Sequence, residues 1–216
     1  MTNLKNSYIL LMVNIMNKEF SNIIIFNNND LNYIKEKILK ILKDLDYVIS
    51  DDKDYNFEVD ILHDNINNIC VVSSKYFAFE NADSNKSVIR KIAKRVAQDT
   101  FMATSQEDIA VVEKYSFNKR TYDYITFGNE EKLKELGYTD SYAMYMYQEI
   151  WKNHFVGRNT IKDLDKVLKE KNTFFNNYEI VIEILKLYGI KPELVTYKIG
   201  DRLSTHEIEK TEIYFK

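Results

Sequence analysis

The chain has 216 residues, of which 45% are hydrophobic and 29% are charged, and its net charge is -3. This composition excludes an intrinsically disordered chain, and the acidic balance argues against general binding to nucleic acid or to anionic membranes. The longest apolar run near the N-terminus, Tyr8 to Val13, is much shorter than the roughly 20 residues of a membrane span, and no cleavage motif follows it. We therefore expect a cytoplasmic protein that spans no membrane.

Cysteine, glycine and proline are scarce. Cys70 is the only cysteine, so neither a disulfide within the chain nor a cysteine zinc cluster can form. With 5 Gly and 1 Pro, the chain has no Gly/Ser-rich or Pro-rich linker, and independently moving domains are not expected. The heavy use of Asn, Lys and Ile indicates an A+T-rich bacterial or phage genome.

Strands dominate the predictions for residues 1–128. Runs rich in Ile, Val and aromatic residues predict strands at 8–14, 22–26, 55–63, 69–77, 108–117 and 121–127. The third and fourth of these strands should pair as a hairpin, and so should the fifth and sixth. An amphipathic helix is expected after an Asp30 cap, and a second one from Ser84 to about Gln98.

Helices dominate the predictions for residues 129–216. Cap residues predict helices that begin after Asn129, Thr160 and Asn176, and an aromatic helix is expected over 140–155. Residues 193–199 and 206–215 alternate in polarity and predict a closing β-hairpin. The fold class is therefore α+β, with a mostly antiparallel sheet and covering helices in 1–128 and a mainly helical part in 129–216, packed as one unit.

The aromatic helix over 140–155 has apolar residues on two sides of its helical wheel. It is either a central helix of the core or a helix with one side exposed to a partner. Tyr142 and Tyr145 are its candidate partner-binding residues, because tyrosine is enriched at interfaces. Tyr122 and Tyr124, on one face of the strand over 121–127, share this chemistry.

Four cations lie together on the helix expected over 87–98. Arg90, Lys91, Lys94 and Arg95 occupy the side opposite its apolar stripe. They fit an acidic partner or phosphate groups, or else they form an ordinary solvated helix face.

Two carboxylates alternate along the strand over 55–63. Glu58 and Asp60 share one face, where they are either a Mg²⁺-binding pair or the solvent-exposed side of an antiparallel strand.

The sequence contains no Gly-rich phosphate loop, no GxSxG elbow and no HExxH motif. We therefore expect a non-catalytic protein-binding protein without a cofactor, either an immunity protein against a toxin or a phage-type inhibitor of a bacterial defence system. Its partner-binding residues would be the four tyrosines and four cations named above. One alternative is a metal-dependent enzyme acting on nucleic acid or nucleotides, with Glu58 and Asp60 as metal ligands. A second alternative is a structural or assembly subunit.

Overall fold

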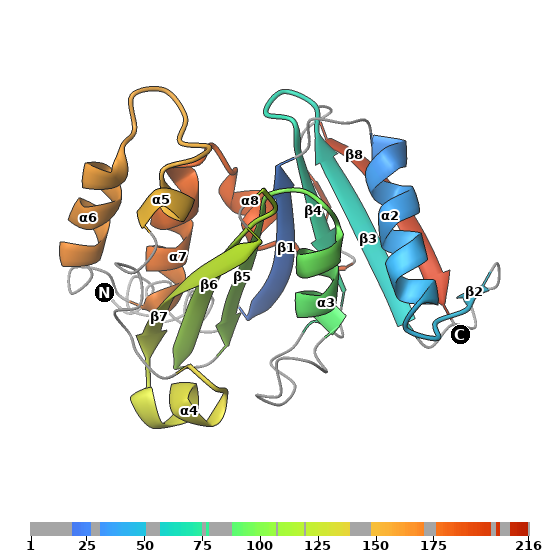
Figure 1. Ribbon diagram of the computed structural model, residues 1–216, viewed down its shortest axis with the longest axis horizontal. Coiled ribbons are helices and arrows are strands. Elements are labelled where there is room, and N and C mark those ends of the chain that lie inside the picture. Colours follow the sequence, from blue (N-terminus) through green and yellow to red (C-terminus); the bar gives the residue numbers. More distant parts are fainter. Residues whose placement is uncertain are drawn as a thin grey trace, which may run out of the picture.

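The computed structural model describes residues 19–26, 31–50, 57–74, 77, 88–106, 108–118, 120–138, 148–170, 176–199, 202–203 and 208–215. These residues form an α+β fold with one eight-stranded antiparallel sheet and seven helices (Figure 1). The strand order is β2-β8-β3-β4-β1-β5-β6-β7. The strands are β1 (Phe20–Phe26), β2 (Ile49–Ser50), β3 (Phe57–Asp64), β4 (Ile69–Ser73), β5 (Thr100–Gln106), β6 (Ile109–Ser116), β7 (Thr121–Gly128) and β8 (Ile208–Phe215).

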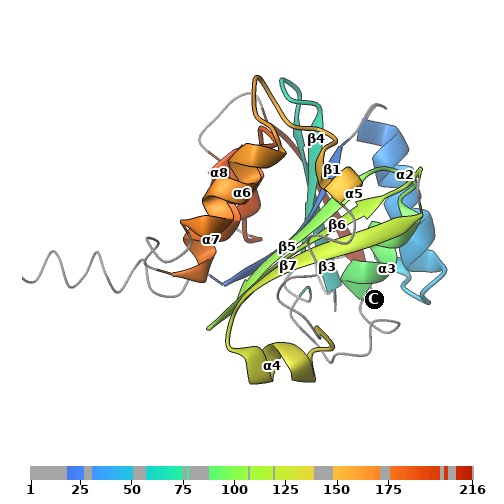
Figure 2. The same ribbon diagram turned by 60° about the vertical axis from the view of Figure 1, so that its left-hand side comes forward.

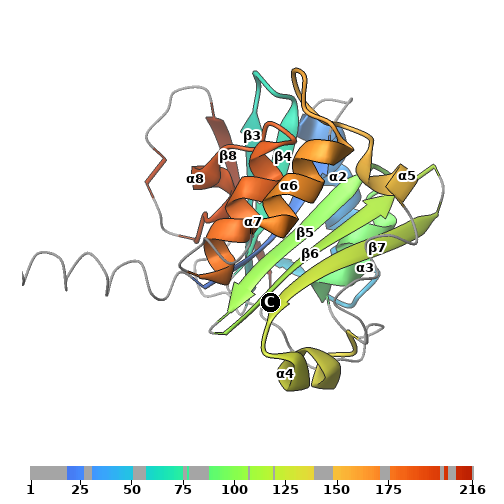
Figure 3. The ribbon, with the colours of Figure 1, turned by 90° about the vertical axis from the view of Figure 1, so that its left-hand side faces the viewer.

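Helices cover both faces of the sheet. The helices are α2 (Leu31–Lys43), α3 (Val88–Arg95), α4 (Glu130–Glu135), α5 (Gln148–Trp151), α6 (Ile161–Lys169), α7 (Asn177–Lys186) and α8 (Pro192–Val195). α2 and α3 lie on one face, α5 to α8 lie on the other, and α4 follows the end of β7 (Figures 2 and 3). Because successive strand residues point to opposite faces, Ile23, Ile24 and Ile25 of β1 are all fully buried.

The sequence predicted most of these elements. β3 pairs with β4 and β6 pairs with β7, so both expected hairpins are confirmed. The predicted capping box at Thr160 and Asp163 is present, and the side chains of Asn129 and Asn176 cap α4 and α7. The expected strand over 8–14 lies outside the described residues.

Three parts of the sheet differ from expectation, and the first is the two-residue strand β2, which was not predicted. β5 was not predicted, because TFMATSQ carries small and polar residues without the alternation that marks a strand. Residues 193–195, expected to be a strand, belong to α8, where Pro192 occupies a position that favours helix initiation. β8 pairs with β3 and β2 instead of forming a hairpin with residues 193–199.

No helix in the described ranges has the length and hydrophobicity of a membrane span.

Replacing Gly128 by Ala should destabilise the fold more than replacing Gly157 by Ala. Both glycines have positive φ, 102° and 62° respectively, which penalises any side chain. A Cβ at Gly128 would also overlap the carbonyl oxygen of Asp108, whereas nothing lies within 4 Å of a Cβ at Gly157. We expect the free energy of unfolding to fall by about 1 to 2 kcal/mol for Gly157→Ala and by at least about 3 kcal/mol for Gly128→Ala, measured by urea denaturation. An equal loss of unfolding free energy in the two variants would contradict the close approach of Gly128 to the carbonyl oxygen of Asp108.

Candidate functional site

Arg90 and Glu113 form a buried ion pair between α3 and β6. Arg90 Nη2 lies 2.8 Å and Arg90 Nε 3.1 Å from Glu113 Oε1. The two side chains are 11% and 1% exposed. Tyr138 donates its hydroxyl proton to Glu113 Oε1 at 2.6 Å, and Tyr115 donates to Glu113 Oε2. Both carboxylate oxygens therefore have hydrogen-bond donors, which buried charges need.

Four tyrosine rings form a continuous row beside this ion pair. Tyr115 stacks on Tyr122 at a centroid distance of 5.4 Å, and Tyr122 lies 6.5 Å from Tyr124. Tyr124 meets Tyr138 edge-on at 5.1 Å. Only Tyr122 in this row is largely exposed, at 47%. The row therefore joins the ion pair to the protein surface.

Burial and charge keep the inner tyrosines protonated. Burial raises the pKa of Tyr115 and of Tyr138 above the ordinary tyrosine value, and the negative charge of Glu113 raises both further. Burial lowers the pKa of Arg90, but the Glu113 carboxylate together with Tyr138 and Tyr115 outweighs this effect, and the pKa is raised. The two hydroxyls therefore remain hydrogen-bond donors, and Arg90 remains charged, at physiological pH.

One cation lies beside the Tyr122 ring, and further exposed side chains are near it along the chain, on α3 and in the β6–β7 turn. Lys94 Nζ lies 5.6 Å from the centre of the Tyr122 ring, within reach of a cation–π interaction. Phe117, in the β6–β7 turn, is 50% exposed, and its N–H donates to Asp99 Oδ1 at 2.8 Å. Arg95 and Arg120 are also exposed. We call this surface the tyrosine face and define it by Tyr115, Tyr122, Tyr124, Tyr138, Phe117, Lys94, Arg95 and Arg120.

The structure brings together several of the predicted partner-binding residues. Tyr122, Tyr124 and Lys94 lie in the tyrosine face, and Arg95 is exposed on the same helix as Lys94. Lys91 is half-buried. Tyr142 and Tyr145 lie outside the described residues.

Arg90 corrects the prediction of a solvated cation face on α3. It is buried against Glu113, because α3 packs on the sheet over a wider arc than its apolar residues indicate. Its guanidinium contacts Glu113 and the ring of Tyr138, at the inner end of the tyrosine row. A partner protein cannot reach this buried guanidinium directly.

Glu58 and Asp60 share one face of β3, as strand alternation predicts, but that face is not solvent-exposed. Glu58 is 7% and Asp60 0% exposed, and the side chain of Tyr197, which follows α8, reaches Asp60. Asp60 Oδ2 accepts hydrogen bonds from Tyr197 OH at 2.5 Å and from Lys210 Nζ at 2.9 Å. Burial, together with this bond to Asp60, raises the pKa of Tyr197 to about 12. Among the described residues, no three His, Cys, Asp or Glu side chains are grouped to hold a metal ion.

Sequence reasoning missed a buried lysine on the other face of β6. Lys114 is fully buried, and its Nζ donates to the carbonyl oxygen of Asn153 at 2.7 Å. The amine also lies 4.4 Å and 4.8 Å from the ring centres of Tyr188 and Phe101. The signal was present in the sequence: Glu113 and Lys114 are consecutive in an apolar strand and must point to opposite faces.

Further polar contacts hold the chain around α5 over Lys114. Trp151 Nε1 donates to Asp123 Oδ2 at 2.8 Å, and Tyr188 OH donates to the carbonyl oxygen of Trp151 at 2.8 Å. His154 Nε2 lies 2.9 Å from Asp99 Oδ2. Trp151, which belongs to the aromatic stretch 140–155, is fully buried and packs in the core.

The ionisable groups of this cluster have shifted pKa values. Burial lowers the pKa of Lys114 to about 7, and the charge of Asp99 opposes this only in part. Burial raises the pKa of Asp123 despite the hydrogen bond from Trp151. A neutral amine is a nucleophile in principle, but Lys114 has no exposed surface to meet a substrate. We therefore interpret Lys114 as a structural residue whose hydrogen bond to Asn153 connects β6 to the chain after α5.

Comparisons of the chain with protein-family models, with curated proteins and with solved structures found no match.

Replacing Glu113 by Gln should strongly destabilise the fold. The change leaves the buried guanidinium of Arg90 without a counter-charge, and breaking such a pair costs about 3 to 5 kcal/mol. The double variant Arg90→Met with Glu113→Gln should recover part of this loss, because no unpaired charge then remains. Chemical denaturation measures both free energies of unfolding. A loss below about 1 kcal/mol for Glu113→Gln would contradict a dry ion pair.

Replacing Lys114 by Met should remove a pH dependence of stability. The Lys114 amine has a pKa of about 7 in the fold and 10.5 as its ordinary value, so between these pH values the unfolded chain binds more protons. Stability attributable to this lysine therefore rises with pH, by up to about 1.4 kcal/mol per pH unit, and the penalty is largest at pH 7 and below.

The measurement is urea denaturation at pH 7.5 and 9.0, where tyrosines of the unfolded chain are still mostly protonated. The pKa of the facing Asp99 carboxylate is lowered, so Asp99 stays ionised throughout this window. Lys114→Met should lose about 2 kcal/mol of the rise seen in the wild type. Lys186→Met, at an exposed lysine, is the control and should keep the rise. Identical pH slopes in wild type and Lys114→Met would overturn the assignment.

Proposed function

We propose that the protein is a non-catalytic protein-binding protein of the inhibitor or immunity type, and that an acidic surface of its partner docks on the tyrosine face. The exposed ring of Tyr122, stacked on Tyr115 and lying near Lys94, is the observation that carries this proposal. A toxin or a defence-system component is the partner class, since such an inhibitor acts by covering a surface and needs no catalytic group.

The geometry of Tyr122 suits it to be an energetic centre of an interface. Tyrosine offers a large apolar ring and a polar hydroxyl, and such residues dominate many interfaces. Stacking on Tyr115 and Tyr124 restricts the Tyr122 ring before binding, which reduces the entropy lost in a complex. Phe117 adds a second exposed ring whose backbone is held by Asp99.

The charge around Tyr122 favours an acidic partner. Lys94 lies beside the Tyr122 ring, and Arg95 and Arg120 are exposed on α3 and in the β6–β7 turn. The negative charge of Glu113, which lies beneath the tyrosine row, is neutralised by Arg90. The chain as a whole carries a net charge of -3, so this surface differs in sign from the average of the protein. Such complementarity accelerates association and fixes the orientation of the partner.

Replacing Tyr122 by Ala should weaken partner binding by at least about 30-fold, the effect of losing an interface hot spot. Lys94→Glu should also weaken binding, most strongly at low salt, because it reverses a charge at the interface. Ile66→Ala is the matched control: Ile66 is 64% exposed but lies in the β3–β4 turn, and its loss should leave the dissociation constant unchanged.

The experiment uses the full chain as bait in a bacterial lysate, with the wild type and the three variants side by side. A candidate partner must be retained by the wild type and by Ile66→Ala and lost with Tyr122→Ala. The purified candidate is then titrated by calorimetry at two salt concentrations. A partner that binds Tyr122→Ala and Lys94→Glu as tightly as the wild type would show that the tyrosine face is not the docking surface.

A further inference from the structure

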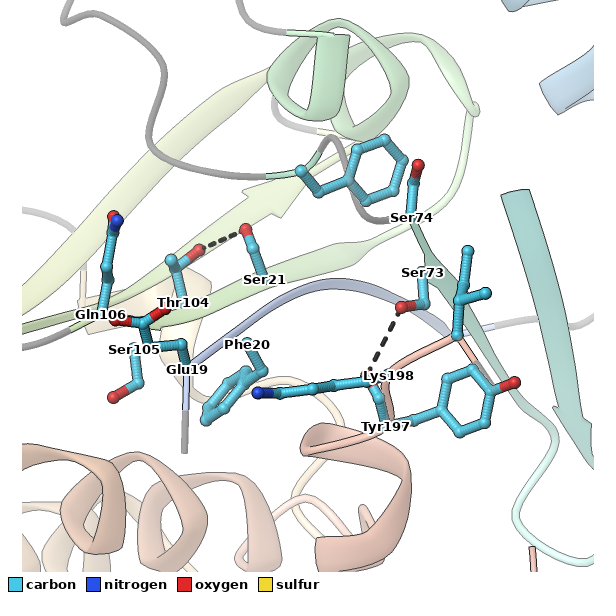
Figure 4. A pocket seen from close by; sticks show the side chains of 12 residues that line it. Glu19, Phe20, Ser21, Ser73, Ser74, Thr104, Ser105, Gln106, Tyr197 and Lys198 are labelled. Carbon is cyan, nitrogen blue, oxygen red and sulfur yellow. Dashed lines mark hydrogen bonds between the residues drawn. The ribbon is translucent and has the colours of Figure 1, made fainter. Parts of the chain in front are cut away.

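A pocket of about 310 Å³ lies at one end of the central strands, away from the tyrosine row. Figure 4 shows side chains from β1, β4, β5 and the segment after α8 around it. Its lining combines five serine and threonine hydroxyls with the rings of Phe20, Phe77 and Tyr197. The hydroxyls belong to Ser21, Ser73, Ser74, Thr104 and Ser105.

The pocket exists because β4 is shorter than β5 beside β1. β1 pairs with β5 from Phe20 onward, where Phe20 lies opposite Ser105. Its pairing with β4 begins only at Asn22, which lies opposite Ser73. No described strand therefore pairs with Phe20 and Ser21 on the β4 side. The pocket occupies the position where a longer β4 would have continued.

The hydroxyls in the pocket are oriented by the fold. Ser74 Oγ donates to the carbonyl oxygen of Glu58 at 2.6 Å, and Ser73 Oγ donates to that of Tyr197 at 3.4 Å. Ser21 Oγ and Thr104 Oγ1 lie 2.9 Å apart and share a hydrogen bond. A hydroxyl that donates its proton still has lone pairs that accept. Strand alternation places Ser21, Ser74 and Thr104 on the face of the sheet covered by α2 and α3, and Ser73 and Ser105 on the other face. The first three hydroxyls therefore suit a ligand that carries several hydrogen-bond donors and also accepts.

The charge of the pocket favours a neutral ligand. Its lining contains one acid, Glu19, and one cation, Lys198, which together leave no excess charge for a phosphate or a carboxylate. Phe20 and Phe77 supply apolar surface among the polar groups. A volume of about 310 Å³ is near the lower end of ligand pockets, so the ligand must be small.

We propose that this pocket binds a small neutral polyhydroxylated ring of the sugar class. Ring hydroxyls would hydrogen-bond to the oxygens of Ser21, Ser74 and Thr104, and a C–H face of the ring would contact Phe77, which packs on the same side of the sheet. A free monosaccharide and the ribose of a nucleoside share this chemistry. The proposal is independent of the tyrosine face, because no residue that defines that face lines the pocket.

The test is calorimetric titration of the full chain with D-glucose, D-ribose, adenosine and uridine. We expect saturable binding of at least one probe, with a dissociation constant of about 10 μM to 1 mM. Binding of the sugars alone would identify a free monosaccharide as the ligand type. Tighter binding of the nucleosides would identify the ribose of a nucleoside.

Two pocket variants and one control locate the site. Thr104→Val keeps the side-chain shape but removes the hydroxyl, and should weaken binding about tenfold, as expected for one lost hydrogen bond. Ser21→Ala, a milder change on the neighbouring strand β1, opposite Thr104, should weaken binding similarly and serves if Thr104→Val does not fold. Thr126→Val makes the same chemical change two strands away and should bind as the wild type does.

Two results would overturn the proposal. One is the absence of saturable binding for all four probes up to about 20 mM, well beyond the affinity expected for a ligand pocket of this kind. The other is binding within about twofold of the wild type by both pocket variants, a difference too small for a lost hydrogen bond.

Discussion

The burial of the central strands on both faces is the constraint on which the rest of the structure depends. A charged side chain on β6 cannot turn towards water, because helices lie over both faces of this part of the sheet. Glu113 and Lys114 are neighbours in sequence, yet each is buried in a different layer. Glu113 is neutralised by Arg90, and the Lys114 amine meets the carbonyl oxygen of Asn153. Unpaired, either group would cost several kcal/mol.

These polar contacts also fix how the covering elements sit on the sheet. Apolar packing is non-directional and permits a helix to slide or rotate, whereas a buried hydrogen bond permits little of either. Asn22 of β1 donates to the carbonyl oxygens of Val195 and Tyr197, at 2.7 Å and 3.0 Å, and so anchors the end of α8. Arg90 anchors α3 over β6 in the same way. The position of Lys94 over the tyrosine row follows from this anchor.

Local sequence signals predicted local structure well, and contacts between layers poorly. Cap residues and alternation located α2, α4, α6, α7 and both hairpins, because those signals depend on the nearest few residues. β5 was not predicted from the sequence, because its neighbours in the sheet, rather than its own composition, determine its conformation. The same limit applies to the candidate site. Alternation correctly placed Tyr122 and Tyr124 on one face of their strand. A helical wheel of α3, however, contains no information about Glu113 on β6, so it could not predict that Arg90 is buried in an ion pair.

The two candidate surfaces lie towards opposite ends of β5, and their separation has a physical consequence. Thr100 of β5 lies opposite Tyr115 in the tyrosine row, whereas Thr104 and Ser105 line the pocket. Energetic coupling between two sites requires an element with two alternative arrangements. β5 is hydrogen-bonded to β1 on one side and to β6 on the other, and its side chains are buried from Thr100 to Ser105. A strand held in this way transmits little conformational change, so a ligand in the pocket and a partner on the tyrosine face should bind additively.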